Sequence, residues 1–103
     1  MRIVAVTSCA TGIAHSYMAA ESLIKAAKAA GDDIKVEIQG AMGIEDELSR
    51  EDVESADLVI LAVDVAVRRP ERFENRNVVE VAPLEAIKDG DAVLEQAKQK
   101  GGF

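Results

Sequence analysis

Short apolar segments rich in β-branched residues alternate along the chain with segments of helical periodicity. The expected strands are residues 2–7, 34–38, 57–64 and 77–81, and the expected helices are residues 13–30, 49–56 and 82–100. Strands separated by helices pair in parallel through right-handed crossovers. The sequence therefore predicts an α/β fold of the Rossmann-like, three-layer kind. We expect one open four-stranded parallel sheet with helices on both faces, and the most apolar strands, the first and third, at its centre.

Local signals refine the expected helices. In the first helix, one face at helical spacing collects apolar residues, namely Ile13, Tyr17, Ala20, Leu23 and Ala27. Ser49 with Asp52 three residues later is a capping signal for a short second helix. Gly90 is the expected point of interruption in the last helical segment.

The composition fits one domain covering residues 1–103, with residues 101–103 expected to fray. The formal net charge of −7 argues against nucleic-acid or anionic-membrane binding, because both need a positive surface. A single cysteine cannot form an internal disulfide, which favours a cytoplasmic protein. Because neither a signal peptide nor an apolar run of ~20 residues is recognisable, we expect no direct membrane insertion.

The chemically richest stretch is VTSCATGIAHS, residues 6–16, which holds the only cysteine and the only histidine. It leaves the first strand and enters the first helix, at the sheet edge where α/β folds bind ligands. The backbone N–H groups of residues 10–15 lie where a helix N-terminus binds phosphate-type anions, and Gly12 permits a tight turn. We expect the same donors to favour the Cys9 thiolate. Cys9 is therefore a candidate nucleophile for phosphoryl transfer.

Purely structural interpretations of this stretch stay open. A lone cysteine at a strand end is often an inert core residue, although the glycine-containing turn argues against that here. His15 either donates to a phosphoryl group or simply makes a structural hydrogen bond. A nucleotide P-loop is excluded because the chain has no Gly-Lys pair. A tyrosine-phosphatase loop would need an arginine where this chain has His15, and an acid, for which Asp64 is a candidate.

The stretch CATGIAHSYMAAESL, residues 9–23, resembles the IIB component of the fructose-type sugar phosphotransferase system. The family pattern is C-P-T-G-I-A-H-T-[FY]-M-A-A-E-x-L. The likeness continues through IKVEIQGAMG at residues 34–43 and EDVESADLVILAVD at residues 51–64, so it covers most of the chain. Ala10 replaces the usual proline, Ser16 the usual threonine, and Asn75 a usual glycine.

The resemblance implies a transferase that works through a phosphocysteine. Cys9 would accept a phosphoryl group from a phosphohistidine of the IIA component. It would pass the group to a sugar held by the membrane component IIC, so the protein would act in the cytoplasm at the inner face of the membrane. The phosphate-binding residues would be Ala10, Thr11, Gly12, Ile13, Ala14 and His15. No metal and no cofactor are required by this scheme.

Docking of two successive partners calls for a basic surface near Cys9. Four of the 12 lysines and arginines fall within residues 68–76, and Arg68, Arg69 and Arg72 are the candidate partner-binding residues. An ordinary solvated loop is an equal alternative for this segment. Two other functions stay open, namely a low-molecular-weight Cys-loop phosphatase or arsenate-reductase-like enzyme, and a sensor of a phosphorylated partner. Fructose rests on the resemblance alone, and mannitol or mannose derivatives are not excluded.

Overall fold

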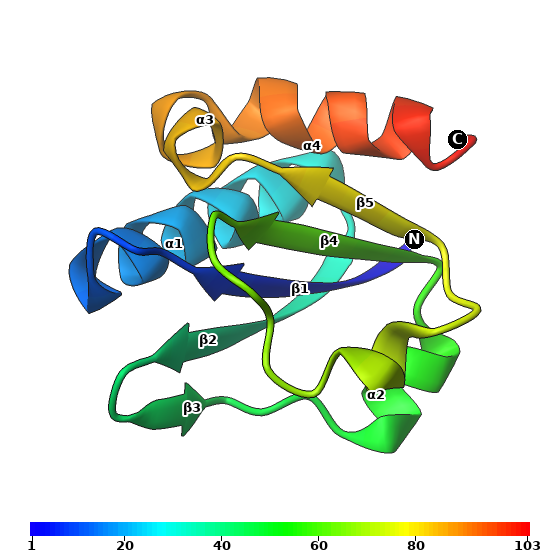
Figure 1. The fold of residues 1–103 in the computed structure, drawn as a ribbon. Coiled ribbons are helices and arrows are strands. Elements are labelled where there is room, and N and C mark those ends of the chain that lie inside the picture. Colours follow the sequence, from blue (N-terminus) through cyan, green and yellow to red (C-terminus); the bar gives the residue numbers. More distant parts are fainter.

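The structure is a computed structural model that describes residues 1–103. One sheet has the strand order β3-β2-β1-β4-β5 (Figure 1). The strands are β1 (Arg2–Ser8), β2 (Asp33–Gly40), β3 (Gly43–Glu45), β4 (Leu58–Val63) and β5 (Val78–Val81). The helices are α1 (Ile13–Ala30), α2 (Arg50–Ser55), the 3₁₀ helix η1 (Pro70–Phe73), α3 (Pro83–Lys88) and α4 (Gly90–Lys100). The predicted α/β class is confirmed.

The sheet contains the four expected parallel strands and one more. β1 pairs in parallel with β2 and β4, and β4 with β5, so the first and third expected strands are central as predicted. The additional strand, β3, pairs antiparallel with β2 and forms the sheet edge. The expected strands and helices leave residues 39–48 outside any element, so this strand was not predicted. Gly43 has a φ of 135°, a conformation that favours glycine, and it begins the short strand that folds back on β2.

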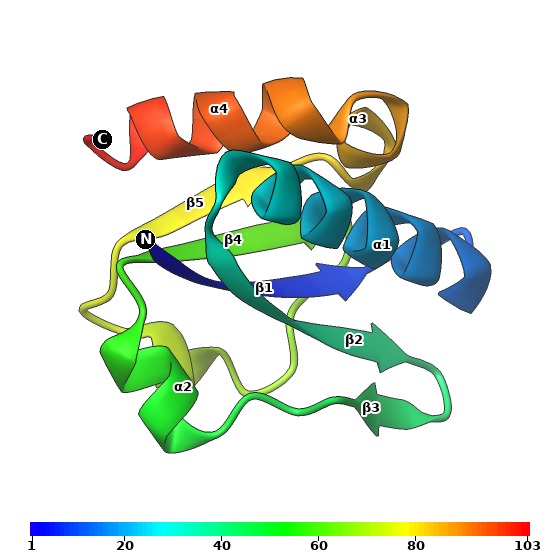
Figure 2. The ribbon, with the colours of Figure 1, turned by 180° about the vertical axis from the view of Figure 1, so that it is seen from behind.

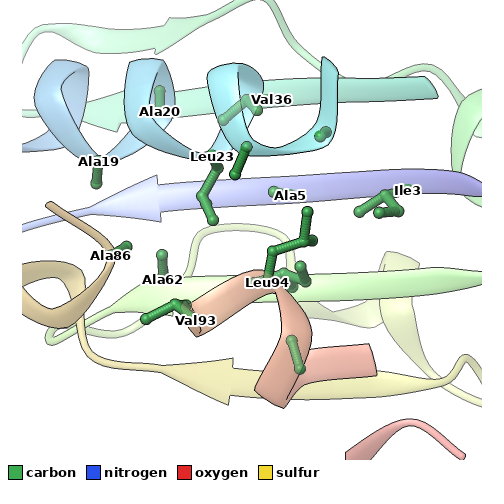
Figure 3. Packing of buried hydrophobic residues seen from close by; sticks show 14 of the residues in the cluster. Ile3, Ala5, Ala19, Ala20, Leu23, Val36, Ala62, Ala86, Val93 and Leu94 are labelled. Atoms are coloured by element: carbon green, nitrogen blue, oxygen red, sulfur yellow. The ribbon is translucent and has the colours of Figure 1, made fainter. Parts of the chain in front are cut away.

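The sheet is covered on both faces, which gives the predicted three layers (Figures 1 and 2). Helices α1, α3 and α4 lie on one face, and α2 with η1 lies on the other. Along β1, Ile3 and Ala5 join the larger core, while Val4 and Val6 join the smaller one. Figure 3 shows Leu23 of α1 close to β1 within the larger core. A strand buried on both faces explains why its sequence is continuously apolar.

The buried face of α1 differs from the predicted one at its first turns. The buried residues are Ser16, Ala19, Ala20, Leu23, Ala26 and Ala27. Ile13 and Tyr17 are instead exposed, at 41% and 43%. The start of α1 projects past the end of β1 in Figure 1, so these residues lie beside the ends of the outer strands rather than over the central ones. Ile13 packs against Gly40, and the Tyr17 hydroxyl donates to Glu45 of β3.

The local signals of the other helices are mostly confirmed. Ser49 and Asp52 form the predicted capping box at α2. The last helical segment breaks at Asp89, one residue before the expected Gly90, because the Asp89 side chain caps α4 by accepting from Ala92 N. Gly90 is required for packing, since a Cβ there would lie 2.4 Å from Ser22 Oγ.

The chain end predicted to fray is hydrogen-bonded in the structure. The N–H of Phe103 donates to the Lys98 carbonyl at 2.8 Å, and the N–H of Gly102 donates to Gln99. The assignment of residues 1–103 to one domain stays a prediction.

A buried ion pair joins β2 to the segment that follows β4. Glu37 is 0% exposed and accepts two bonds from the Arg72 guanidinium, at 2.7 and 2.9 Å. It also accepts from Gln39 Nε2 and from the N–H of Leu48. Gln39 in turn holds the backbone of Arg68, accepting from its N–H at 2.9 Å and donating to its carbonyl. The network therefore fixes the course of the chain between β4 and η1.

Burial opposes ionisation of Glu37, but the bonds from Arg72, Gln39 and Leu48 outweigh it and hold the pKa of the Glu37 carboxyl below its usual range. A carboxyl with a depressed pKa in the folded state stabilises the fold above its unfolded-state pKa. That contribution is lost as the pH falls through the folded-state value.

We predict that Arg72→Met lowers the free energy of unfolding by about 3 kcal/mol or more at neutral pH, because it leaves a buried carboxylate unpaired. Urea denaturation measures this loss. The deficit relative to wild type should shrink at acidic pH, where Glu37 can take up a proton. Arg50→Met, which removes an exposed pair with Glu54, is the control and should cost about 0.5 kcal/mol or less. Equal effects of the two variants would contradict this account.

Candidate active site

Cys9 lies in a four-residue turn between the last residue of β1, Ser8, and the first of α1, Ile13. The turn is closed by a bond from the N–H of Gly12 to the Cys9 carbonyl, at 3.3 Å. Gly12 has a φ of 126°, which other residues rarely adopt, so the glycine is needed for this path. The Cys9 side chain is half-buried and residues 10–14 are exposed. The sulfur is therefore neither packed into the core nor fully solvated.

Four of the six predicted phosphate-binding N–H groups have no acceptor within the protein. They belong to Thr11, Ile13, Ala14 and His15. The other two are engaged, because Gly12 bonds to Cys9 and the N–H of Ala10 donates to Asp64 Oδ1 at 2.7 Å. The free groups lie at the start of α1, where the helix dipole favours an anion.

The predicted preference for the Cys9 thiolate is wrong. Burial raises the pKa of the Cys9 thiol, the hydroxyl of Ser16 lowers it, and the carboxylate of Asp64 raises it further. The net direction is upward, because loss of hydration disfavours the charged sulfur. The surroundings of Cys9 in the isolated protein therefore favour the thiol over the thiolate.

Ser16 was not among the predicted site residues. Its side chain is fully buried in the first turn of α1. It lies beside Cys9 and lowers the pKa of that thiol, yet the hydroxyl makes no hydrogen bond of ordinary distance and angle. The hydroxyl of Thr7, near the end of β1, is also buried without a partner. A polar residue on the buried face of α1 is the signal that could have identified Ser16.

Asp64 is the second residue brought to the turn by the fold. Ser8 pairs with Val63 in the register of β1 and β4, so Asp64 follows its strand directly beside the Cys9 turn. Its N–H donates to the Ser8 carbonyl at 3.2 Å, while its carboxylate holds Ala10. Asp64, which the sequence offered as a candidate acid, therefore lies next to the Cys9 turn.

His15 lies in the first turn of α1 and contacts Thr11. The Thr11 hydroxyl and His15 Nδ1 are 2.5 Å apart. Nδ1 is engaged by this contact, whereas Nε2 makes no hydrogen bond within the protein. The bond to Thr11 agrees with the structural interpretation of His15, and donation to a phosphoryl group stays a prediction.

The three candidate partner-binding arginines have different environments. Arg68 is exposed and its side chain has no acidic partner. Arg69 is paired with Glu47. The Arg72 side chain is only 11% exposed and is held by Glu37, so the structure does not leave it free for a partner. Glu37 lies three residues before the end of β2, in a stretch that alternates apolar and polar residues, so nothing in the local pattern pointed to its burial or to this pairing.

A cavity lies away from the Cys9 turn. A hollow of about 490 Å³ lies near the amino ends of β1 and β2, lined among others by Arg2, Asp33, Lys35 and Asp52. Lys35 and Asp52 already pair with each other there, at 2.9 Å. The Cys9 turn is instead an open part of the surface, which suits a protein partner better than an enclosed small ligand.

The chain matches the family described as PTS system, Lactose/Cellobiose specific IIB subunit, over residues 4–96. This chain belongs to the PTS IIB family. It is 50% identical over 95 residues to the PTS system fructose-like EIIB component 2 of Escherichia coli K12, covering 92% of this chain and 90% of that protein. The resemblance stated from residues 9–23 is thereby confirmed.

Known structures of IIB proteins have the same fold. The Enzyme IIB subunit of the PTS system from Escherichia coli K12 superposes with a TM-score of 0.88 at 37% identity, covering 95% of this IIB chain and 91% of the other. The family description and the names of relatives differ in the sugar that they mention.

Some relatives carry a IIB segment within a much longer chain. The Fructose-like PTS system EIIBC component of Escherichia coli K12 is 43% identical over 98 residues, which cover 93% of this IIB chain but 20% of the relative. Its name joins a IIB and a IIC component. In the present structure no helix combines the length and the apolar character needed to span a membrane.

We predict that Ser16→Ala shifts the pH profile of Cys9 alkylation by iodoacetamide to higher pH, because the variant loses the hydroxyl that lowers the pKa of the thiol. Ser22→Ala is the matched control on the same helix, since Ser22 bonds to the Ala86 carbonyl. An unchanged profile in Ser16→Ala, or an equal shift in Ser22→Ala, would remove Ser16 from the site.

Proposed function

We propose that this IIB protein is a phosphocysteine relay in sugar uptake. Cys9 accepts a phosphoryl group from a phosphohistidine of a IIA protein and donates it to a sugar bound by a membrane IIC component. The observation that carries this proposal is the placement of the only thiol on an exposed turn beside four unpartnered N–H groups. Membership in the PTS IIB family supports the same reaction. Names of relatives favour fructose as the sugar.

The acceptance step is a displacement at phosphorus. The Cys9 sulfur loses its proton to solvent and forms the S–P bond while the N–P bond of the donor breaks. The departing nitrogen keeps the bonding electron pair, and its ring leaves as neutral imidazole because the other nitrogen carries a proton. In the donation step the S–P bond breaks, a sugar hydroxyl oxygen bonds to phosphorus, and the hydroxyl proton is released.

The turn stabilises the transferring group through its backbone. We assign the phosphate oxygens to the N–H groups of Thr11, Ile13, Ala14 and His15, which have no acceptor within the protein. Gly12 shapes the turn, and Ala10 fixes it through Asp64 rather than binding phosphate. His15 Nε2 is the side-chain nitrogen available to the same group. The scheme uses neither a metal nor a nucleotide.

Docking of both partners uses the surface around the turn. Arg68, exposed and without an acidic partner, is the residue best suited to attract an anionic phosphorylated donor. Arg69 can contribute if Glu47 releases it, and Arg72 acts by holding the segment in place. Docking to IIC would bring the protein to the cytoplasmic face of the membrane.

The hydrolase alternative is not favoured. A tyrosine-phosphatase loop clamps phosphate with an arginine at the position of His15, and the Asp64 carboxylate is occupied by the N–H of Ala10. The relatives are named as phosphotransferase components rather than phosphatases.

We predict one phosphoryl group on Cys9 when the protein is incubated with phosphoenolpyruvate, the general phosphotransfer enzyme, the histidine carrier and a fructose-type IIA. Peptide mass spectrometry under non-acidic conditions locates the group, which should be lost in acid as expected for a thiophosphate. Cys9→Ser is the control. An unlabelled wild-type protein, or equal labelling of Cys9→Ser, contradicts the relay. Steady phosphate release from p-nitrophenyl phosphate would favour the hydrolase.

A further inference from the structure

Two aspartates close the pair of central strands β1 and β4 at its two ends. At the amino end, the N–H of Arg2 donates to Asp57 Oδ2 at 2.8 Å, and the N–H of Asp57 returns to the Arg2 carbonyl. At the carboxyl end, the N–H of Ala10 donates to Asp64 Oδ1 at 2.7 Å. Each carboxylate thus satisfies a backbone donor just outside the strand pairing.

The two ends differ in what lies beside the carboxylate. Asp57 faces no reactive group of the site, whereas Asp64 holds the amide that directly follows Cys9. The negative charge of Asp64 acts on the Cys9 sulfur, which none of the other carboxylates is found to do. A purely structural cap needs only an oxygen that accepts the hydrogen bond. That role does not account for a negative charge beside the nucleophile of the proposed relay.

We propose that Asp64 is a positioning residue for phosphoryl transfer: it fixes the Cys9 turn through Ala10 and destabilises a phosphoryl group on the sulfur, which promotes its onward transfer. This proposal rests on the relay function given above. It concerns the free energy of the phosphorylated state of Cys9. The relay function identifies the nucleophile but does not determine that free energy.

The physical argument is a balance of charges around one turn. A phosphoryl group on Cys9 brings about two negative charges close to the carboxylate, and like charges repel. Asp64 cannot turn away without giving up the bond from Ala10. The free N–H groups at the start of α1 offset part of the repulsion. Under this proposal the N–H groups allow Cys9 to accept the phosphoryl group, and the repulsion from Asp64 promotes its onward transfer.

Asp64 does not act as a proton carrier in this scheme. In the donation step the sulfur keeps the electron pair of the breaking S–P bond, the sugar oxygen gains the P–O bond, and its proton leaves to solvent. The other titratable group of the turn is His15, which is bonded to Thr11. The exposed Arg68 follows in the same segment as Asp64. A test of Asp64 must therefore separate the effect of its charge from any effect of the His15 side chain.

The first experiment measures Cys9 alone and needs no partner protein. Iodoacetamide alkylation is followed against pH in wild type, Asp64→Asn and Asp57→Asn. Asparagine keeps an oxygen that can accept from the backbone N–H but removes the charge. We expect the profile of Asp64→Asn to move to lower pH and that of Asp57→Asn to match wild type. The same comparison in a His15→Gln background should give the same displacement.

The second experiment measures the phosphoryl group. Wild type, Asp64→Asn and Asp57→Asn are equilibrated with a fixed ratio of phosphorylated to free IIA, and phosphorylated IIB is quantified by mass spectrometry. We expect the ratio of phosphorylated to free protein to rise on the order of fivefold in Asp64→Asn only, the size expected for removing one nearby like charge. Transfer of the phosphoryl group from Cys9 to its acceptor, a sugar bound by IIC, should then be slower in that variant.

The outcomes separate this proposal from the relay function. If wild type takes no phosphoryl group, the relay fails, whatever the alkylation profiles show. If all three proteins are alkylated and phosphorylated alike, the relay stands and the proposed role of Asp64 is overturned. If Asp64→Asn does not fold, as judged by circular dichroism, Asp64→Ser provides an uncharged acceptor for the same two measurements.

Discussion

The parallel pairing of β1 with β4 brings the chain segments that follow these two strands to the same edge of the sheet. Ser8 lies opposite Val63, so the turn containing Cys9 and the residue Asp64 leave the sheet side by side. Because β1 places Ile3 and Ala5 in one core and Val4 and Val6 in the other, a slip of one residue would exchange these side chains between the cores and disturb the packing of both. Core packing thereby fixes the position of Cys9 relative to the Asp64 carboxylate.

The surroundings of Cys9 combine opposing effects rather than one activating group. Partial burial and Asp64 disfavour a negative sulfur, while Ser16 favours it. The free N–H groups of the α1 start favour a larger anion bound just beyond the sulfur. In the relay that we propose, these surroundings hold a transferred phosphoryl group briefly rather than maintain a reactive thiolate. The Glu37–Arg72 pair helps to hold this arrangement, because it anchors the segment that begins at Asp64.

The sequence was sufficient for the features that depend on periodicity and on local motifs. The four parallel strands, the central place of residues 2–7 and 57–64, and the family could be predicted from the apolar pattern and from residues 9–23. Three features could not. β3 consists of three residues with little apolar character, and its pairing depends on a reversal at Gly43.

The other two features arise from contacts between distant segments. Arg72 reaches Glu37 across 35 positions of the chain, and Asp64 reaches Ala10 across 54, so no local pattern reveals either pairing. The upward shift of the Cys9 pKa was not predictable for the same reason, because burial of the sulfur depends on the tertiary fold. The helix N-terminus was visible in the sequence, whereas the desolvation that opposes it was not.

The most direct measurement for the central claim is the backbone amide spectrum of the ¹⁵N-labelled protein before and after phosphorylation of Cys9. The account predicts that the amide protons of Thr11, Ile13, Ala14 and His15 move most, and downfield, as their N–H groups acquire an anionic acceptor. Those of Ala10 and Gly12, already bonded to Asp64 and Cys9, should move less. Largest changes outside residues 9–16, or none within the turn, would contradict a phosphoryl group held by the start of α1.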